Sequence, residues 1–255
     1  MTASDAMQSG GTPALLTVAN GNWGATSLAT IRAVLGCAHG VLTSAFGTTP
    51  DAPVRVARWD REPRALCHQR PYEIRLNARD RYWCQYIYQF SHELCHVMTG
   101  FDRYRDHKHK WFEEAVCETA SLFVLHRVAK TWEEVPPPDI FGARDFAANH
   151  QIYADNIETG YRRIPDTPLP EWFAANIPRM EADPYRRDLN GVVAVASLDR
   201  FREDPSLWRD CGSLNQWDSG ADATFACYLD SWAACLSGKG RFARTAAIVR
   251  EVFEP

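Results

Sequence analysis

Two histidines and a glutamate lie close together in residues 92–96, which read HELCH. On an α-helix, residues four positions apart project from one face, with Cβ atoms roughly 5–6 Å apart. The imidazoles of His92 and His96 can therefore reach one metal ion through Zn–N bonds of about 2.0–2.1 Å. Glu93 lies about 100° around the helix from His92, beside the ion rather than on it. A carboxylate in that place can take a proton from a metal-bound water, so the spacing predicts hydrolytic metal chemistry.

A catalytic zinc ion takes three protein ligands and keeps one position for water, so a third ligand must come from elsewhere. A second helix is predicted over residues 111–130. In it, Glu114 is the best candidate for the third ligand, and Glu118 lies one turn further on the same face. Glu118 can accept a hydrogen bond from the far nitrogen of a ligand histidine. In the competing interpretation, Glu113, Glu114 and Glu118 form a solvated face, because acidic residues are favoured near a helix N-terminus.

The elements that must position these residues follow from the hydrophobic pattern. The histidines lie in a helix predicted over residues 81–99, with Asp80 as its N-cap and Gly100 as its end. Residues 27–46 predict another helix, and residues 54–59 and 72–76 alternate as strands do. Residues 101–110 are charged and are expected to form a solvated loop that includes His107 and His109. The apolar residues that should turn the motif helix toward the core are Trp83, Ile87, Phe90, Leu94 and Val97.

The chain is expected to divide into three parts. Residues 1–22 are small and polar and predict a flexible lead, and residues 23–135 hold the strands and both metal-binding helices. Prolines at positions 136–138 mark a boundary, and residues 136–255 predict an all-helical domain. The expected fold class is therefore α+β. The helices predicted in the second domain cover residues 143–161, 171–181, 188–203, 206–217, 223–236 and 242–253.

Residues 92–96 (HELCH) and residues 111–118 (WFEEAVCE) together resemble the gluzincin clan of zinc metallopeptidases. This clan includes the thermolysin-like enzymes and the aminopeptidases related to leukotriene hydrolase. By this resemblance Glu114 is the third zinc ligand, Glu113 stands where the clan has asparagine, and Ala115 fills a small position. The resemblance implies a zincin-like catalytic domain, one zinc ion, peptide-bond hydrolysis and a helical domain that closes the cleft. It also implies a substrate-pairing strand, for which residues 72–76 are the candidate.

Other functions stay open at this point. The chain can be a zinc-binding regulatory or interaction module on a zincin scaffold without turnover, or a non-peptidase amide hydrolase with the same centre. In enzymes of this clan, a tyrosine or histidine from the second domain stabilises the oxyanion of the tetrahedral intermediate. Four residues of this chain are candidates for that role: Tyr153, Tyr161, Tyr185 and His150.

The composition and charge of the chain limit the classes of partner that the sequence indicates. The formal net charge of −4 gives no indication of nucleic acid or an anionic membrane as a partner. No apolar run is expected to approach a membrane span of about 20 residues, and no signal peptide is recognised, so a cytoplasmic location is expected. The eight cysteines are expected to be reduced, and none shows the C-x-x-C spacing of a structural zinc site. The expected partner is a peptide or small protein substrate.

Overall fold

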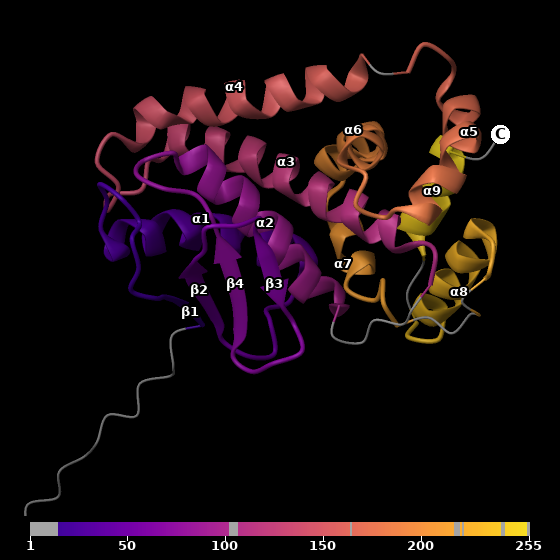
Figure 1. The fold of residues 1–255 in the computed structure, drawn as a ribbon, viewed down its shortest axis with the longest axis horizontal. Coiled ribbons are helices and arrows are strands. Elements are labelled where there is room, and N and C mark those ends of the chain that lie inside the picture. Colours follow the sequence, from indigo (N-terminus) through magenta and orange to yellow (C-terminus); the bar gives the residue numbers. More distant parts are fainter. Residues whose placement is uncertain are drawn as a thin grey trace, which may run out of the picture.

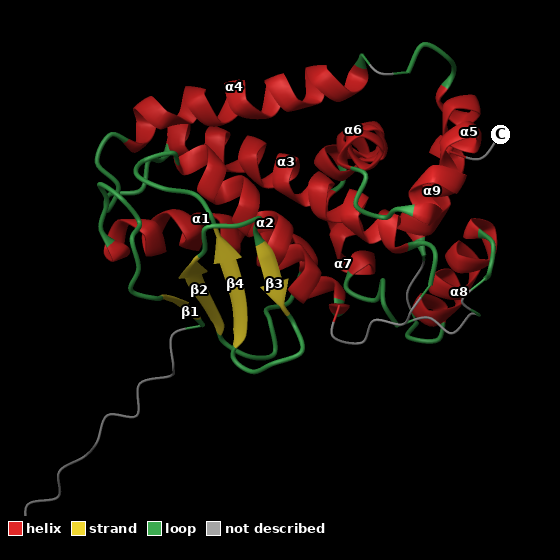
Figure 2. Cartoon of the chain, viewed as in Figure 1, coloured by secondary structure: helices red, strands yellow, loops and turns green. Residues whose placement is uncertain are grey.

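A small mixed sheet and a set of helices make up the described part of the chain (Figures 1 and 2). The computed structural model describes residues 15–101, 107–163, 165–216, 220, 222–240 and 243–253. The strands are β1 (Leu16–Val18), β2 (Val54–Arg58), β3 (Arg64–Leu66) and β4 (Tyr72–Leu76). The helices are α1 (Leu28–Phe46), α2 (Trp83–Thr99), α3 (Lys110–Glu134), α4 (Ala143–Arg162), α5 (Leu169–Ala182), α6 (Arg187–Glu203), the 3₁₀ helix η2 (Pro205–Leu207), α7 (Trp208–Cys211), α8 (Phe225–Ser237) and α9 (Arg244–Phe253). This inventory agrees with the predicted α+β class.

The sheet has one buried face. Its strand order is β1-β2-β4-β3, with β1, β2 and β4 parallel and β3 antiparallel at the edge. Val54, Val56 and Ile74 are fully buried, whereas Arg55, next to Val54 along β2, is exposed. This alternation explains why α1 and α2 cover one face of the sheet (Figure 1).

The structure corrects the sequence prediction at both edges of the sheet. Residues 1–14 of the predicted lead lie outside the described residues, but residues 16–18 of that lead form β1. The strands predicted at 54–59 and 72–76 are β2 and β4. However, β4 is hydrogen-bonded to β2 on one side and to β3 on the other. It therefore has no free edge for a substrate, and the strand at the edge is β3, which was not predicted.

Helix α2 begins and ends by different means. Asp80 is not its N-cap: the helix begins at Trp83, and Asp80 has a positive φ of 54°. The Asp80 carboxylate instead accepts a hydrogen bond of 2.7 Å from the Ala25 backbone N–H. Gly100 ends the helix as predicted, with a φ of 78° that favours glycine. Its N–H points to the carbonyls of His96 and Val97, so the last turn that holds His96 is closed.

The helices on the two sides of the proline segment share one core. Helix α4 runs along α3, which also contacts α2 and α6 (Figure 1). Buried residues from β2 to α9 belong to a single hydrophobic cluster. The division at residue 135 into two domains stays a prediction.

Of the predicted C-terminal helices, 206–217 is much shorter in the structure, where η2 and α7 together end at Cys211.

Helix α1 corrects the expectation that no apolar run reaches the length of a membrane span. Among the described residues it is the one helix that is long and apolar enough to cross a membrane. One such helix is weak evidence for a span, because a buried core helix passes the same test. Ile31, Val34 and Leu35 of α1 are fully buried in the core.

Candidate metal centre

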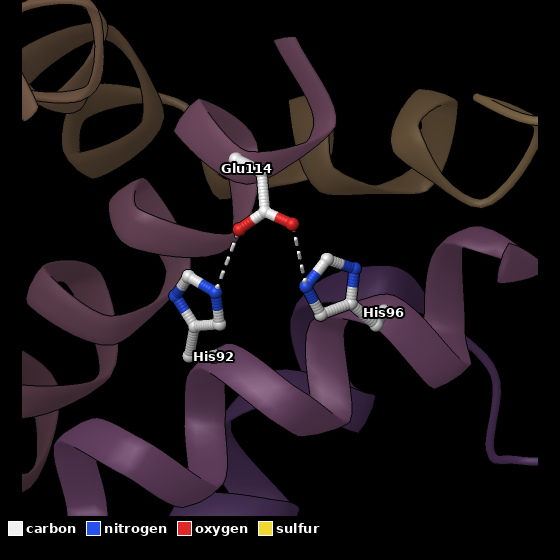
Figure 3. Close-up of side chains that lie close together, drawn as sticks. All are labelled: His92, His96 and Glu114. Atoms are coloured by element: carbon white, nitrogen blue, oxygen red, sulfur yellow. Dashed lines mark hydrogen bonds and ion pairs between the residues drawn. The ribbon is translucent and has the colours of Figure 1, made fainter. Parts of the chain in front are cut away.

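Helices α2 and α3 bring together three side chains that can hold a metal ion. His92 and His96 lie one turn apart on α2, with ring centroids 5.2 Å apart. Glu114 of α3 lies opposite both rings (Figure 3). One of its carboxylate oxygens lies 3.3 Å from His92 Nε2, and the other lies 3.6 Å from His96 Nε2. The three ligand atoms all lie within 4.8 Å of one another.

These distances suit a tetrahedral ion. With bonds of about 2.0–2.1 Å, neighbouring donors of a tetrahedral zinc site lie about 3.4 Å apart. Each imidazole has one oxygen of Glu114 near that distance, Oε2 at 3.3 Å from His92 and Oε1 at 3.6 Å from His96. Both imidazoles present Nε2, which leaves each Nδ1 for a second partner. The donor set of two imidazoles and one carboxylate is also the usual set of a catalytic rather than a structural site.

Each histidine has a second carboxylate behind it. His96 Nδ1 lies 3.2 Å from Glu113, whose carboxylate also accepts a hydrogen bond of 2.6 Å from the Thr99 hydroxyl. His92 Nδ1 lies 3.8 Å from Glu118, which accepts a hydrogen bond from the Tyr88 hydroxyl. Such partners fix the tautomer and orientation of a ligand histidine.

Sequence reasoning suggested Glu118 for this role but missed Glu113. The reason is that an acidic residue in the first turn of α3 is already explained by the helix dipole. A signal that could have found it is Thr99, one turn after His96 at the end of α2, which holds the same carboxylate.

Charge is strongly coupled within the centre. Burial raises the pKa of Glu114, but the positive charge of His96 and the hydrogen bond with His92 outweigh burial and lower that pKa to about 2. Burial lowers the pKa of His96, but Glu114 and Glu113 outweigh it and raise that pKa to about 10. Without a metal ion, His96 is therefore protonated, and its positive charge offsets the negative charge of the neighbouring carboxylates. A bound cation would replace that proton, so metal binding should release protons.

Glu93 lies beside the three ligands rather than among them. Its side chain is buried, with the residue only 6% exposed, and it lines the same cavity as His92 and His96. Burial raises the pKa of Glu93, while the two histidines and a hydrogen bond from the Ala65 backbone lower it. A carboxyl group with a raised pKa next to a water-binding position suits proton transfer near neutral pH.

The centre opens into a cavity of about 780 Å³ that is lined from both sides. One wall is the segment 59–65, which leads into β3, and the facing wall comes from the start of α6 with Arg187, Asn190 and Gly191. Phe101 and Tyr185 also line it. A chain of several residues can enter such a space, and so can a small molecule.

The four candidates for oxyanion stabilisation lie in different places. Tyr185 lines the cavity and is 67% exposed. Tyr153 packs edge-on against Tyr88, with centroids 5.8 Å apart, and Tyr161 packs against Gly191 of α6. His150 is fully buried between α3 and α4. In the described part of the chain, Tyr185 is thus the candidate that faces the metal-binding residues.

Other histidines have structural surroundings. His107 and His109 are buried, which corrects the expected solvated loop at these two positions. Residues 102–106 of that loop lie outside the described residues. His109 Nε2 lies 2.6 Å from the Ala223 carbonyl. His126, Asp155 and Glu158 form another group with ligand atoms close together, but Arg162 lies 3.5 Å from Glu158 and balances its charge.

Comparison of the chain with protein-family models, with curated proteins and with solved structures finds no match. The class of the centre therefore follows from its own geometry. Two imidazoles and a carboxylate are positioned to hold one metal ion, with further carboxylates around them.

Proposed function

We propose that the protein is a zinc-dependent metallopeptidase of the gluzincin type. The observation that carries the proposal is the convergence of His92, His96 and Glu114, with Glu93 beside them in one cavity. The same three donors also suit non-haem iron. The buried acid one residue after the first ligand favours zinc, because hydrolysis needs a base and iron oxygenation does not use one in this place.

The chain's own groups account for the steps of hydrolysis. A zinc ion in this centre would lower the pKa of a water toward about 7 and polarise the substrate carbonyl. Glu93 accepts the proton of the attacking water and passes it to the leaving nitrogen. Tyr185 lines the same cavity, so its hydroxyl is the candidate donor of a hydrogen bond to the developing oxyanion. Glu113 would hold the His96 imidazole in the tautomer that leaves Nε2 free. Glu118 would take the corresponding place beyond Nδ1 of His92, from which it lies 3.8 Å away.

The edge strand supports a polypeptide as substrate. Among the described residues β3 pairs with a strand on one side alone, which is β4, and Ala65 at its centre lies next to Glu93. An extended peptide can add to such an edge through backbone hydrogen bonds. A peptide bound in this way would lie beside the proposed base and metal ligands. The cavity volume also fits a small substrate, so a non-peptidase amide hydrolase is the second candidate function.

The test combines metal analysis with turnover. Purified protein should contain one zinc per chain and should cleave fluorogenic peptides until a chelator is added. Glu93→Gln should keep the zinc and lose at least about a hundredfold in kcat, the range of a general base. His96→Ala should lose the zinc. Cleavage that persists in Glu93→Gln, or iron in place of zinc, would refute the proposal, and cleavage of small amides alone would favour the second candidate.

A further inference from the structure

Two arginines on the rim of the cavity have no carboxylate partner among the described residues. Arg61 and Arg64 line the same cavity as the metal ligands and are exposed. Their guanidinium carbons lie 5.9 and 5.6 Å from the centre of the Trp59 ring. Cation–π contact of this kind fixes a guanidinium group without neutralising its charge.

A third arginine at the same ring shows the difference. Arg75 lies 4.5 Å from the Trp59 ring centre, but its Nε also lies 2.7 Å from Glu73, which neutralises it. In contrast, Arg61 and Arg64 keep their positive charge available to a ligand.

The acids of the cavity are engaged elsewhere. Glu114 and Glu118 face the imidazoles, and Glu93 is buried beside them. The remaining acid, Glu62, is exposed and stands between Arg61 and Arg64 in the sequence. Two arginines thus stand against one glutamate in residues 61–64, so the formal charge of this side of the cavity is positive.

The register of β3 shows which part of a ligand meets this charge. Arg64 lies opposite Arg75, and Ala65 lies opposite Ile74, which is fully buried. Ala65 therefore faces the helices, and Arg64 faces the other side of the sheet. A peptide that extends the sheet at β3 would alternate in the same way, so every second residue would project on the side of Arg64.

Resting on the proposed function, we infer that Arg61 and Arg64 select polypeptides that carry a carboxylate beside β3, at alternate residues near the cleaved bond. Arginine matches a carboxylate through two parallel hydrogen bonds, which makes the selection geometric as well as electrostatic. The carboxylate can belong to an acidic side chain or to the end of the substrate chain.

The experiment scans one glutamate through a fluorogenic peptide and replaces it by glutamine at each position. For the wild type, kcat/KM should be about fivefold higher with glutamate at one position or at positions two apart, the size of an exposed ion pair. The double change Arg61→Gln and Arg64→Gln should remove this preference, whereas the corresponding lysine variant should keep part of it. Arg127→Gln, an exposed arginine of α3 outside the cavity, is the matched control. Peptides with free and amidated C-termini separate the two sources of the carboxylate.

A binding arm separates this inference from the peptidase proposal. The affinity of each peptide for Glu93→Gln is measured by calorimetry in low and in high salt. Tighter binding of the glutamate peptide that weakens with salt and disappears in the double variant supports the arginine site even if no peptide is cleaved. Cleavage with equal kcat/KM for both peptides would overturn the inference and leave the peptidase standing. Equal binding of both peptides by Glu93→Gln would overturn it as well.

Discussion

Three carboxylates of α3 lie near the two imidazoles of α2, in two kinds of position. Glu114 lies between the Nε2 atoms, where a ligand must lie, and Glu113 and Glu118 lie behind at the Nδ1 atoms. Glu113 is also tied to Thr99, which gives it a fixed position before any metal binds. A preset partner reduces the freedom that the imidazole must lose on binding.

Changing Glu113→Gln should weaken metal binding without removing a ligand. Outer partners of this kind contribute about 10–100-fold to metal affinity, so we expect a loss in that range. The measurement is zinc affinity by competition with a chromophoric chelator. Glu133→Gln, at an exposed position of the same helix, should bind zinc as the wild type does. Unchanged affinity of Glu113→Gln would mean that the Glu113–His96 contact does not support the centre.

Much of this centre could be predicted from spacing alone. The positions of His92, Glu93 and His96 on one helix, and of Glu114 and Glu118 on the next, need only the helical repeat. The part that spacing could not supply is the direction from which α3 approaches α2. The direction of approach brings Glu113 within reach of His96, and it depends on side-chain packing between the helices.

At the scale of elements, α6 approaches α4 closely at one glycine. A methyl group added at Gly191 would lie 2.2 Å from the ring of Tyr161, far inside contact distance. Gly191 also lines the cavity, next to Asn190. The glycine thus lets the wall of the cavity lie directly against the outer helix.

Gly191→Ala should therefore destabilise the protein by about 1–3 kcal/mol, the range of overpacking, because the Tyr161 ring must move. Gly160→Ala is the matched control on α4, where an added methyl group meets nothing within 4 Å. That change should be neutral or stabilise by up to about 1 kcal/mol, because alanine favours the helix. Both are measured by urea unfolding, and equal stability of the two variants would contradict the close approach.

Helices α3 and α4 are also joined at a buried histidine. The His150 ring lies 4.7 Å from Trp132, and in the described part neither ring nitrogen has a hydrogen-bond partner. Burial lowers the pKa of His150 to about 4 from its ordinary value of 6.5. The folded protein therefore binds the proton less readily than the unfolded chain. Its stability contribution is complete above pH 6.5 and is lost as the pH falls toward 4.

Unfolding free energy should thus fall by about 1.4 kcal/mol per pH unit from this residue between those values. His150→Leu removes the proton site without breaking a hydrogen bond, so the variant should lose less stability on acidification. Urea unfolding from pH 7 to pH 4 measures the slope, with His68→Leu at an exposed position as the control. Parallel pH profiles for the wild type and His150→Leu would show that His150 is not the cause.

Strand prediction succeeded where the segments were long enough to alternate. β2 and β4 have five residues each: β2 buries Val54 and Val56, and β4 buries every second residue, at Tyr72, Ile74 and Leu76. β1 and β3 have three residues each, too few for a pattern, and neither has a fully buried face. The edge strand next to the metal centre, β3, could therefore be identified only from the structure.

Helix boundaries were predicted well where apolar spacing was regular. They were predicted poorly at 206–217, where Pro205 begins a tight 3₁₀ turn.

Over the whole molecule, the helices that carry the candidate metal ligands share one hydrophobic core with the C-terminal helices. Trp111 and Phe112, beside the ligand Glu114, pack against Phe225 of α8 with ring centroids 4.9 and 5.3 Å apart. Stabilisation of the metal centre should therefore also stabilise the C-terminal helices, because the two are packed directly against each other.

Metal removal should consequently lower the melting temperature of the whole chain in one transition. At a metal concentration of 100 times Kd the ion stabilises the folded state by about 2.7 kcal/mol, or about 5–10 °C for a chain of this size. Calorimetry with and without chelator measures the shift, and His96→Ala should show none. Two transitions, of which the chelator moves one, would instead support the predicted division at residue 135.

The open edge of β3 has a further consequence for the behaviour of many copies in solution. A free strand edge can pair with the same strand of another molecule and start aggregation. When two copies approach edge to edge through β3, Arg61 and Arg64 of each copy bring like charges to the same contact, which opposes the pairing. Arg61 and Arg64, to which we assign the choice of substrate, would thus also keep the protein monodisperse. A variant without them would lose its substrate preference and would self-associate more readily.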